Sequence, residues 1–242
     1  MHQSIYTLIL FSLVLLLSCN NENTKSTTAK ADHSTDKQTS ESVVNASKES
    51  TEDLTKYGIA NYEHNELGGL QVGDKAPNFK LKNQDGQEQD LETALQQGPV
   101  LLVFLRAEWC SFCVRHLKEF QDNIQDIQEK GQAQVIAISP QESSFMKEFH
   151  EENQFSFPIL FDIDHVAMKD YKVFFRVTEK YNDYIKEAKG ERIEVYNGDT
   201  NAYLPVPATY LIGQDKVIKY VHYDPNYKKR SDLKEVIAQL EK

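Results

Sequence analysis

Cysteine, glycine, proline and positive charge are all scarce in this chain of 242 residues. Ten glycines and seven prolines exclude a collagen-like or low-complexity protein. Three cysteines are too few for the dense disulfide framework of a small secreted scaffold, and their odd number leaves one to be explained apart from the others. Lysine and arginine total 27 against 37 acidic residues, a net charge of -10. This deficit disfavours a nucleic-acid-binding protein, because phosphate binding needs clustered excess cations.

The first apolar segment, residues 4–18, is too short to cross a bilayer as a helix, which takes about 20 residues. It ends in Ser18 and Cys19, and a short apolar run before a small residue is typical of a secretory signal. The segment resembles the bacterial lipoprotein signal, although its start lacks lysine and arginine. The resemblance implies cleavage before Cys19, a lipid on its thiol, and membrane attachment in the bacterial cell envelope, facing the periplasm. An ordinary signal or an uncleaved anchor is the alternative.

Composition divides the rest of the chain into two parts. Residues 20–56 contain few apolar side chains, too few to offset the entropy cost of ordering them. We therefore expect a signal peptide at 1–18, a lipidated Cys19 with a flexible polar tether at 19–66, and a folded domain at 67–242.

From residue 67 onward, short apolar runs alternate with amphipathic segments, which predicts an α/β fold with a central mixed sheet flanked by helices. An alternating segment before the turn at 83–86 predicts an N-terminal β-hairpin. Ser231 is the expected N-cap of the last helix, and Gly131 the expected stop of the first long one. Strands are expected at 100–105, 135–138, 158–161, 208–212 and 217–221, and helices at 111–130, 141–152, 165–171, 178–189 and 231–240.

The strongest chemical motif is the pair Cys110 and Cys113, placed where the 100–105 strand leads into a helix. Cys113 begins an apolar stripe at helical spacing and should be covered. Cys110 lies at the helix N-terminus, where free N–H groups and the helix dipole favour a thiolate. Cys110 is therefore expected to attack and Cys113 to resolve by forming a disulfide.

Charged neighbours modify this expectation. Arg106, Arg115 and His116 could add positive charge beside the thiolate, and Glu108 would oppose it. Two inert buried thiols are one alternative. Zinc is another, but the chain has no second C-x-x-C or C-x-x-H from which to draw a full ligand set, so we expect neither a metal nor a cofactor.

Residues 109–113, Trp-Cys-Ser-Phe-Cys, together with Val206-Pro207-Ala208-Thr209, resemble the thioredoxin fold. With residues 72–79, 137–140, 204–212 and 224–227 and Arg230, the chain is similar to the peroxiredoxin-like branch of the alkyl hydroperoxide reductase and thiol-specific antioxidant family. The resemblance implies a cis peptide bond at Pro207, packed beside the cysteine pair. It also implies a substrate-binding role for Trp109, Val206, Pro207 and Arg230.

Three positions depart from the family pattern. Peroxiredoxins carry P-x-x-x-T-x-x-C, whose proline and threonine help to hold the peroxide, but this chain has Val103 and Ala107 there. Ser111 stands where this branch usually has proline. These departures keep thiol–disulfide exchange open beside peroxide reduction.

The sequence thus predicts a membrane-tethered thiol oxidoreductase without a metal or other cofactor. Its substrate would be a hydroperoxide, with a protein disulfide as the alternative, and an external thioredoxin-like dithiol would reduce the Cys110–Cys113 disulfide. Arg106 is the first candidate to polarise a peroxide and Arg230 the second. A non-catalytic binding protein that keeps the redoxin fold is the alternative from another class.

Overall fold

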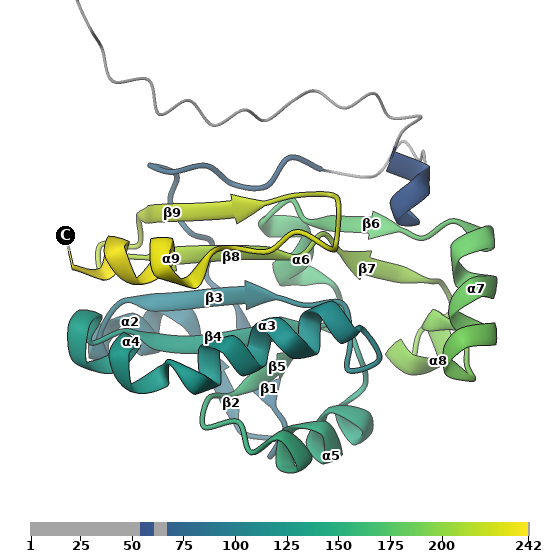
Figure 1. Ribbon diagram of the computed structural model, residues 1–242, viewed down its shortest axis with the longest axis horizontal. Helices are drawn as coiled ribbons and strands as arrows, with labels where there is room; N and C mark the ends of the chain where they lie inside the picture. Colours follow the sequence, from purple (N-terminus) through teal and green to yellow (C-terminus); the bar gives the residue numbers. More distant parts are fainter. Residues whose placement is uncertain (1–53, 61–66, 242) are drawn as a thin grey trace, which may run out of the picture. The chain divides into compact units, whose positions relative to one another are not determined.

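The structure, a computed structural model, describes residues 54–60 and 67–241. Within these residues a mixed seven-stranded sheet has the order β2-β1-β5-β4-β3-β8-β9 (Figure 1). Its strands are β1 (Lys80–Asn83), β2 (Glu88–Asp90), β3 (Val100–Phe104), β4 (Gln134–Ser139), β5 (Ile159–Phe161), β8 (Ala208–Ile212) and β9 (Ile218–Tyr223). β3 runs parallel to β4 and antiparallel to β8, so the predicted α/β fold with a mixed sheet is confirmed.

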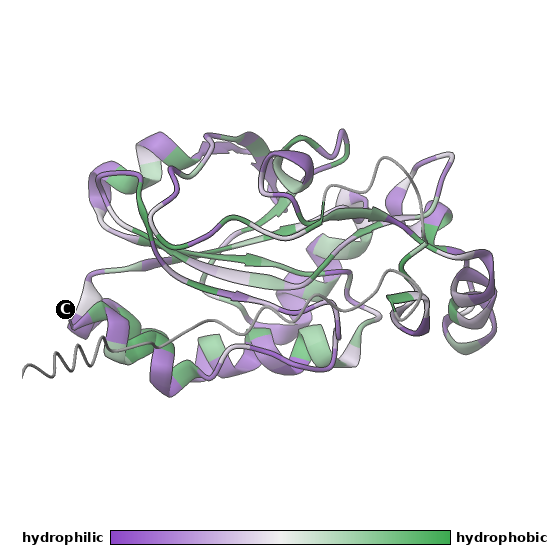
Figure 2. Ribbon diagram, turned by 90° about the horizontal axis from the view of Figure 1, so that it is seen from above, coloured by the Kyte–Doolittle hydropathy of each residue, from purple (hydrophilic) through white to green (hydrophobic). Residues whose placement is uncertain are grey.

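Helices flank this sheet. The helices are α2 (Leu91–Gln97), α3 (Ser111–Asp122), α4 (Ile124–Gly131), α5 (Ser143–Asn153), α6 (Val166–Asp170), α7 (Glu179–Lys189), α8 (Ile193–Asn197) and α9 (Leu233–Leu240). α3, α4 and α9 lie in front of the sheet in Figure 1. Figure 2 shows hydrophobic residues along the central strands and mixed hydropathy on the helices. Every residue of β3 is buried, which agrees with its continuous apolar run and places it at the centre of the core.

The predicted N-terminal hairpin is formed by β1 and β2, which pair antiparallel. The Asn83 side chain fixes its turn, because Oδ1 accepts hydrogen bonds from the backbone N–H groups of Asp85 and Gln87. β1 then pairs antiparallel with β5, so the hairpin extends the main sheet at one edge.

The single helix predicted at 111–130 is in fact two helices, α3 and α4, separated at Asn123. The side chain of Asn123 donates from Nδ2 to the carbonyl of Glu119, and such local side-chain bonds compete with regular helix. The second helix ends at Gly131 as expected. A Cβ on Gly131 would lie 2.7 Å from the Leu240 side chain, so this glycine also permits the close packing of α4 against α9.

Residues 54–60 pack with the folded domain, although they precede the boundary expected at residue 67. This segment contains a short 3-10 helix, η1 (Thr55–Tyr57), and Ile59 pairs with Val177 and is buried. Its backbone also bonds to the domain, with Ala60 donating to Arg176 and Thr178 donating to Gly58. The composition of this segment did not predict that it packs against the domain, because the packing depends on one buried side chain, Ile59. Residues 1–53, including the expected signal and Cys19, lie outside the described residues.

A second, two-stranded sheet was not predicted. It is formed by β6 (Phe174–Arg176) and β7 (Tyr203–Pro205), and α7 and α8 lie between these strands in the chain. The aromatic-rich stretch at 171–175 belongs to the core except for Lys172, which is exposed. No helix among the described residues is long and apolar enough to span a membrane.

Candidate active site

The cysteine pair lies where β3 leads into α3, as predicted. Cys110 is the N-cap of α3, and its carbonyl accepts hydrogen bonds from the N–H groups of Cys113 and Val114. Both cysteines are free thiols, and the Cys113 Sγ donates to the Cys110 Sγ at 2.7 Å. Cys110 therefore has the helix N-terminus on one side and the Cys113 thiol in direct contact.

Burial does not distinguish the two sulfurs. Cys113 is 2% exposed, as the apolar stripe predicted, and Cys110 is 3% exposed. What distinguishes them is charge. Although burial would raise the pKa of Cys110, the hydrogen bond from Cys113 and the positive charges of Arg106 and Arg230 bring that pKa well below its usual range. Burial and the neighbouring Cys110 thiolate instead raise the pKa of Cys113 well above its usual range.

Arg106 is the cation nearest the leading sulfur. Its Nη2 lies 3.5 Å from the Cys110 Sγ, and the residue is only 3% exposed. Aromatic rings surround the guanidinium, with the Tyr227 ring centroid 3.7 Å from Cζ and the Trp109 and Tyr181 rings within 5.5 Å. A buried cation enclosed in this way has little water around it, so its interaction with a thiolate is strong.

Tyr181 fixes the orientation of that guanidinium, and sequence reasoning missed this residue. Its hydroxyl oxygen accepts a hydrogen bond of 2.8 Å from Arg106 Nη1. Burial raises the pKa of Tyr181, so the hydroxyl stays protonated. Gly58 makes room for the ring, because a Cβ there would lie 2.5 Å from Tyr181 Cγ. An aromatic residue within a predicted helix carries no local signal of such a contact.

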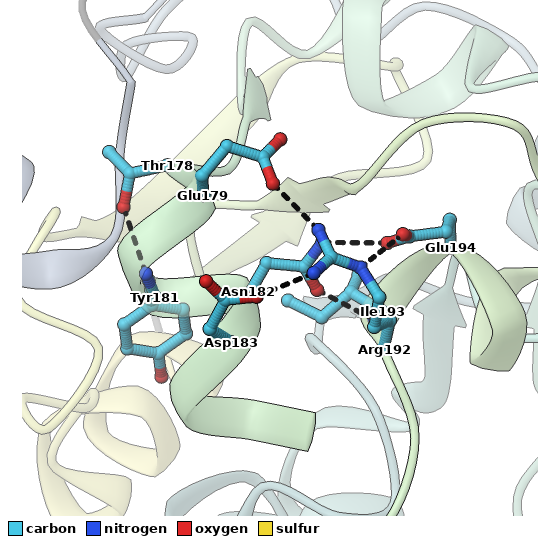
Figure 3. A network of polar contacts seen from close by, with 8 residues as sticks. All are labelled: Thr178, Glu179, Tyr181, Asn182, Asp183, Arg192, Ile193 and Glu194. Atoms are coloured by element: carbon cyan, nitrogen blue, oxygen red, sulfur yellow. Dashed lines mark hydrogen bonds and ion pairs between the residues drawn. The ribbon is translucent and has the colours of Figure 1, made fainter. Parts of the chain in front are cut away.

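The helix that carries Tyr181 is held by a polar network (Figure 3). Thr178 caps α7 by accepting a hydrogen bond from the Tyr181 N–H. Arg192 forms ion pairs with Glu179 and Asp183 of α7 and with Glu194 of α8. Asn182 Oδ1 accepts from the Ile193 N–H and its Nδ2 donates to Glu194. Together these contacts fasten α7 to α8 and so hold the helix that presents Tyr181.

Arg230 contacts the other sulfur. Its Nη2 lies 3.4 Å from the Cys113 Sγ, while Nη1 donates to the carbonyls of Tyr227 and Lys229. The two arginines predicted for the site are thus both beside the cysteine pair, one against each sulfur.

Two expected sources of positive charge do not act on Cys110. Burial, with the charges of Arg230 and His222, lowers the pKa of His116 to about 3, so this side chain is neutral. Its Nε2 pairs with the Ser231 hydroxyl at 2.9 Å. The exposed Arg115 lies over the Phe112 ring.

The expected N-cap of the last helix at Ser231 is wrong. Asp232 caps α9 instead, and the Ser231 hydroxyl pairs with His116.

Glu108 is half-buried, and burial raises the pKa of its carboxyl group. The Glu108 carboxylate accepts a hydrogen bond from the Trp109 N–H, and the Glu108 N–H donates to Gln141 Oε1. These bonds hold the loop that leads to Cys110. Burial thus disfavours the charged form of Glu108, and the hydrogen bond from the Trp109 N–H favours it.

The other residues predicted for the site are Trp109, Val206 and Pro207. Trp109 lines a surface groove of about 540 Å³ together with Val114 and Lys118, beside the cysteine helix. Val206 and Pro207 are buried between β7 and β8. The expected cis bond at Pro207 is wrong, since the described residues contain no cis peptide bond. The chain passes from one strand into the next in this segment, with the Val206 N–H bonded to the Val173 carbonyl, and the ordinary trans form fits that path.

No group of three or more histidine, cysteine or acidic side chains could hold a metal ion in residues 54–60 and 67–241. His165 pairs with Asp199 at 2.7 Å and is buried under aromatic rings, remote in sequence from the cysteines. At the cysteine pair, two guanidinium groups contact the two sulfurs.

Comparison with known proteins agrees with this geometry. Residues 72–221 match the model of the AhpC/TSA family. Chloroplastic peroxiredoxin Q of Oryza sativa subsp. japonica is 24% identical over 174 residues, covering 72% of this chain and 68% of the relative. Peroxiredoxin Bcp of Escherichia coli (strain K12) is 30% identical over 108 residues, covering 45% of this chain and 68% of the relative. The crystal structure of peroxidoxin BcpB from Mycobacterium tuberculosis has the same fold, with a TM-score of 0.55 at 20% identity, covering 71% of this chain and 96% of that one.

The thioredoxin-like sheet and the dithiol at a helix N-terminus define a thiol-dependent oxidoreductase of peroxiredoxin type. Since the family match spans more than half of the chain, the protein belongs to the AhpC/TSA family. The resemblance stated from residues 72–79 and the cysteine segment is confirmed.

Replacing Tyr181 by phenylalanine should slow the reaction of Cys110 with peroxide about tenfold, because Arg106 loses one hydrogen-bond acceptor in a buried site. Single-turnover kinetics would measure this, with Tyr184→Phe as the control, because Tyr184 lies on the same helix and is exposed. If Tyr181 acts through Arg106, adding Tyr181→Phe to Arg106→Met should cause no further loss. Equal rates in the Tyr181 and Tyr184 variants would contradict the prediction.

Proposed function

We propose that this protein is a thiol peroxidase in which Cys110 reduces a hydroperoxide and Cys113 resolves the product. The observation that carries the proposal is the Cys110 sulfur, which lies beside a buried Arg106 and accepts the thiol proton of Cys113 at 2.7 Å. A thiolate is the nucleophilic form of cysteine, and both contacts stabilise it.

In the first step the Cys110 thiolate attacks the distal oxygen of the peroxide. The O–O bond breaks and the distal oxygen, with its proton, stays on Cys110 as a sulfenic acid. The other oxygen leaves as an alkoxide or hydroxide and takes up a proton from solvent to become an alcohol or water. Charge develops on the leaving oxygen, and a fixed cation stabilises it. Arg106 suits this role because its Nε–H is buried and has no acceptor among the described residues, which leaves one donor free for a ligand.

In the second step the Cys113 sulfur attacks the sulfenic sulfur. The S–O bond breaks, a disulfide forms and water leaves with the Cys113 proton. An external dithiol, thioredoxin-like in kind, then exchanges with this disulfide and is itself oxidised. The contact between the two sulfurs supports resolution without movement of the helix.

Reduction of protein disulfides is a second candidate, favoured by one specific observation. The family threonine that helps to hold peroxide is replaced by Ala107, which is buried and offers no hydroxyl group. Stopped-flow kinetics of the reduced protein with hydrogen peroxide and with a small disulfide-bonded protein would separate the candidates. Faster reaction with peroxide supports the peroxidase, and faster reaction with the disulfide overturns it in favour of the second candidate.

We further propose that the protein is anchored to a membrane of the bacterial envelope through a lipid on Cys19, and that it faces the periplasm. The support is the apolar run at 4–18 that ends at this cysteine. Mass spectrometry of protein from bacterial membranes should show an N-terminus at Cys19 with attached acyl chains. Cys19→Ala should release the protein from the membrane fraction, and an intact Met1 would contradict the anchor.

A further inference from the structure

The two sulfurs of the site have separate cationic partners. Arg106 Nη2 contacts the Cys110 Sγ at 3.5 Å, and Arg230 Nη2 contacts the Cys113 Sγ at 3.4 Å. The arginines come from distant parts of the chain, since Arg230 lies 117 residues beyond Cys113. Both arginines lower the pKa of Cys110, but it is Arg230 that contacts the Cys113 sulfur, and this contact needs its own explanation.

We propose that Arg230 is a catalytic residue of the resolving step, where it stabilises the thiolate of Cys113 after Cys110 has been oxidised. This inference rests on the peroxidase function proposed above. It gives Arg230 a different task from Arg106, which acts on the peroxide and on the Cys110 thiolate.

In the reduced protein the Cys113 thiol keeps its proton and donates it in a hydrogen bond to the Cys110 thiolate. Burial and the negative charge of that thiolate raise the pKa of Cys113. Oxidation turns Cys110 into a neutral sulfenic acid, which removes this negative charge. The positive charge of Arg230 then acts on Cys113 with no neighbouring anion to oppose it, and the Cys113 thiolate becomes accessible. The thiolate attacks the sulfenic sulfur, and the proton that it lost leaves with the hydroxyl group as water.

The position of Arg230 is fixed before the reaction begins. Nη1 donates to the backbone carbonyls of Tyr227 and Lys229, which leaves Nη2 directed at the sulfur. The next residue, Ser231, is anchored by hydrogen bonds to His116 and Thr209. His116 is neutral, so it does not share the task. A cation held in place in this way stabilises developing charge without reorganisation.

The test separates the two chemical steps in the full chain. Sulfenate formation with hydrogen peroxide is followed through the fluorescence of Trp109, the only tryptophan of the sequence, and by trapping with a dimedone probe. Disulfide formation is followed by quenching with a thiol-alkylating reagent and mass spectrometry. The variants are Arg230→Gln, which removes the charge, and Arg230→Lys, which keeps it. Arg115→Gln is the control, because Arg115 is an exposed arginine on α3.

Arg230→Gln should slow disulfide formation about tenfold to hundredfold. It should slow sulfenate formation by a clearly smaller factor, because Arg230 also helps to lower the pKa of Cys110 but Arg106 still contacts that sulfur. Arg230→Lys should recover most of the loss, and Arg115→Gln should change neither step. Equal slowing of both steps, or disulfide formation at the parent rate in Arg230→Gln, would overturn the inference while leaving the peroxidase intact. A parent protein that forms no sulfenate with peroxide would overturn the peroxidase, and the inference with it.

Discussion

Replacing Cys110 by serine should reduce peroxide turnover by a factor on the order of 10⁴ or more, to the rate of the uncatalysed background. A serine hydroxyl in the same position keeps its proton at neutral pH, so Arg106 and the helix N-terminus have no anion to stabilise. The measurement is peroxide consumption by the full chain with a dithiol reductant, and disulfide reductase activity should be lost in parallel.

Cys113→Ser is the matched variant, because it changes the neighbouring sulfur and keeps the attacking one. It should still form sulfenate with peroxide, and the sulfenate should accumulate because Cys110 and Cys113 are the only cysteines in the part of the chain that the structure describes. Turnover with a thioredoxin-like reductant should fall sharply while one equivalent of peroxide is still consumed. Turnover retained in Cys110→Ser, or a single-turnover loss confined to Cys113→Ser, would reverse the assignment of the two roles.

Replacing Arg106 by methionine should have the second largest effect, a loss of about 10²- to 10³-fold at neutral pH. Methionine keeps the apolar bulk among Tyr227, Tyr181 and Trp109 but removes the charge that lowers the pKa of Cys110. Because the thiolate is the reactive form, its fraction rises as pH rises through that pKa. The parent should reach its full rate at a lower pH than the variant, and the variant should regain part of its loss as the pH is raised.

The pH–rate profile of the single turnover measures this shift. Arg106→Lys keeps a charge without the planar fork, so it should fall between the parent and Arg106→Met. Arg115→Met should leave the profile unchanged, since Arg115 faces solvent on α3. A profile for Arg106→Met that matches the parent at every pH would show that Arg106 does not control Cys110.

Much of the fold followed from local patterns. Continuous apolar runs placed β3, β4 and β8, and the helical stripe that begins at Cys113 placed α3. The failures had two causes, a pairing between distant segments and a local side-chain bond. Strands β6 and β7 have three residues each, too few for a period to be visible. Asn123 interrupts a helix that its neighbours would continue, through one side-chain bond to Glu119.

The same division holds for the active site. The cysteine pair and Arg106 lie within eight residues of one another, so the sequence alone predicted that they share a site. Tyr181 reaches Arg106 across 75 residues of chain, and no motif marks that contact. The charge of His116 could not be predicted either, because its neutral form depends on burial against Ser231. Local sequence thus identifies the sulfurs proposed to react, while the groups that orient their neighbours depend on tertiary structure.

The measurement that most directly tests the account is an ultraviolet titration of thiolate absorbance in the reduced protein, compared with Cys110→Ser. If Cys110 is an activated thiolate, the parent should carry the thiolate absorbance of one sulfur at pH values well below about 8.5, where an ordinary cysteine titrates. Cys110→Ser should lose this absorbance. Thiolate absorbance that develops only near pH 8.5 or above, or that persists unchanged in Cys110→Ser, would contradict an activated Cys110.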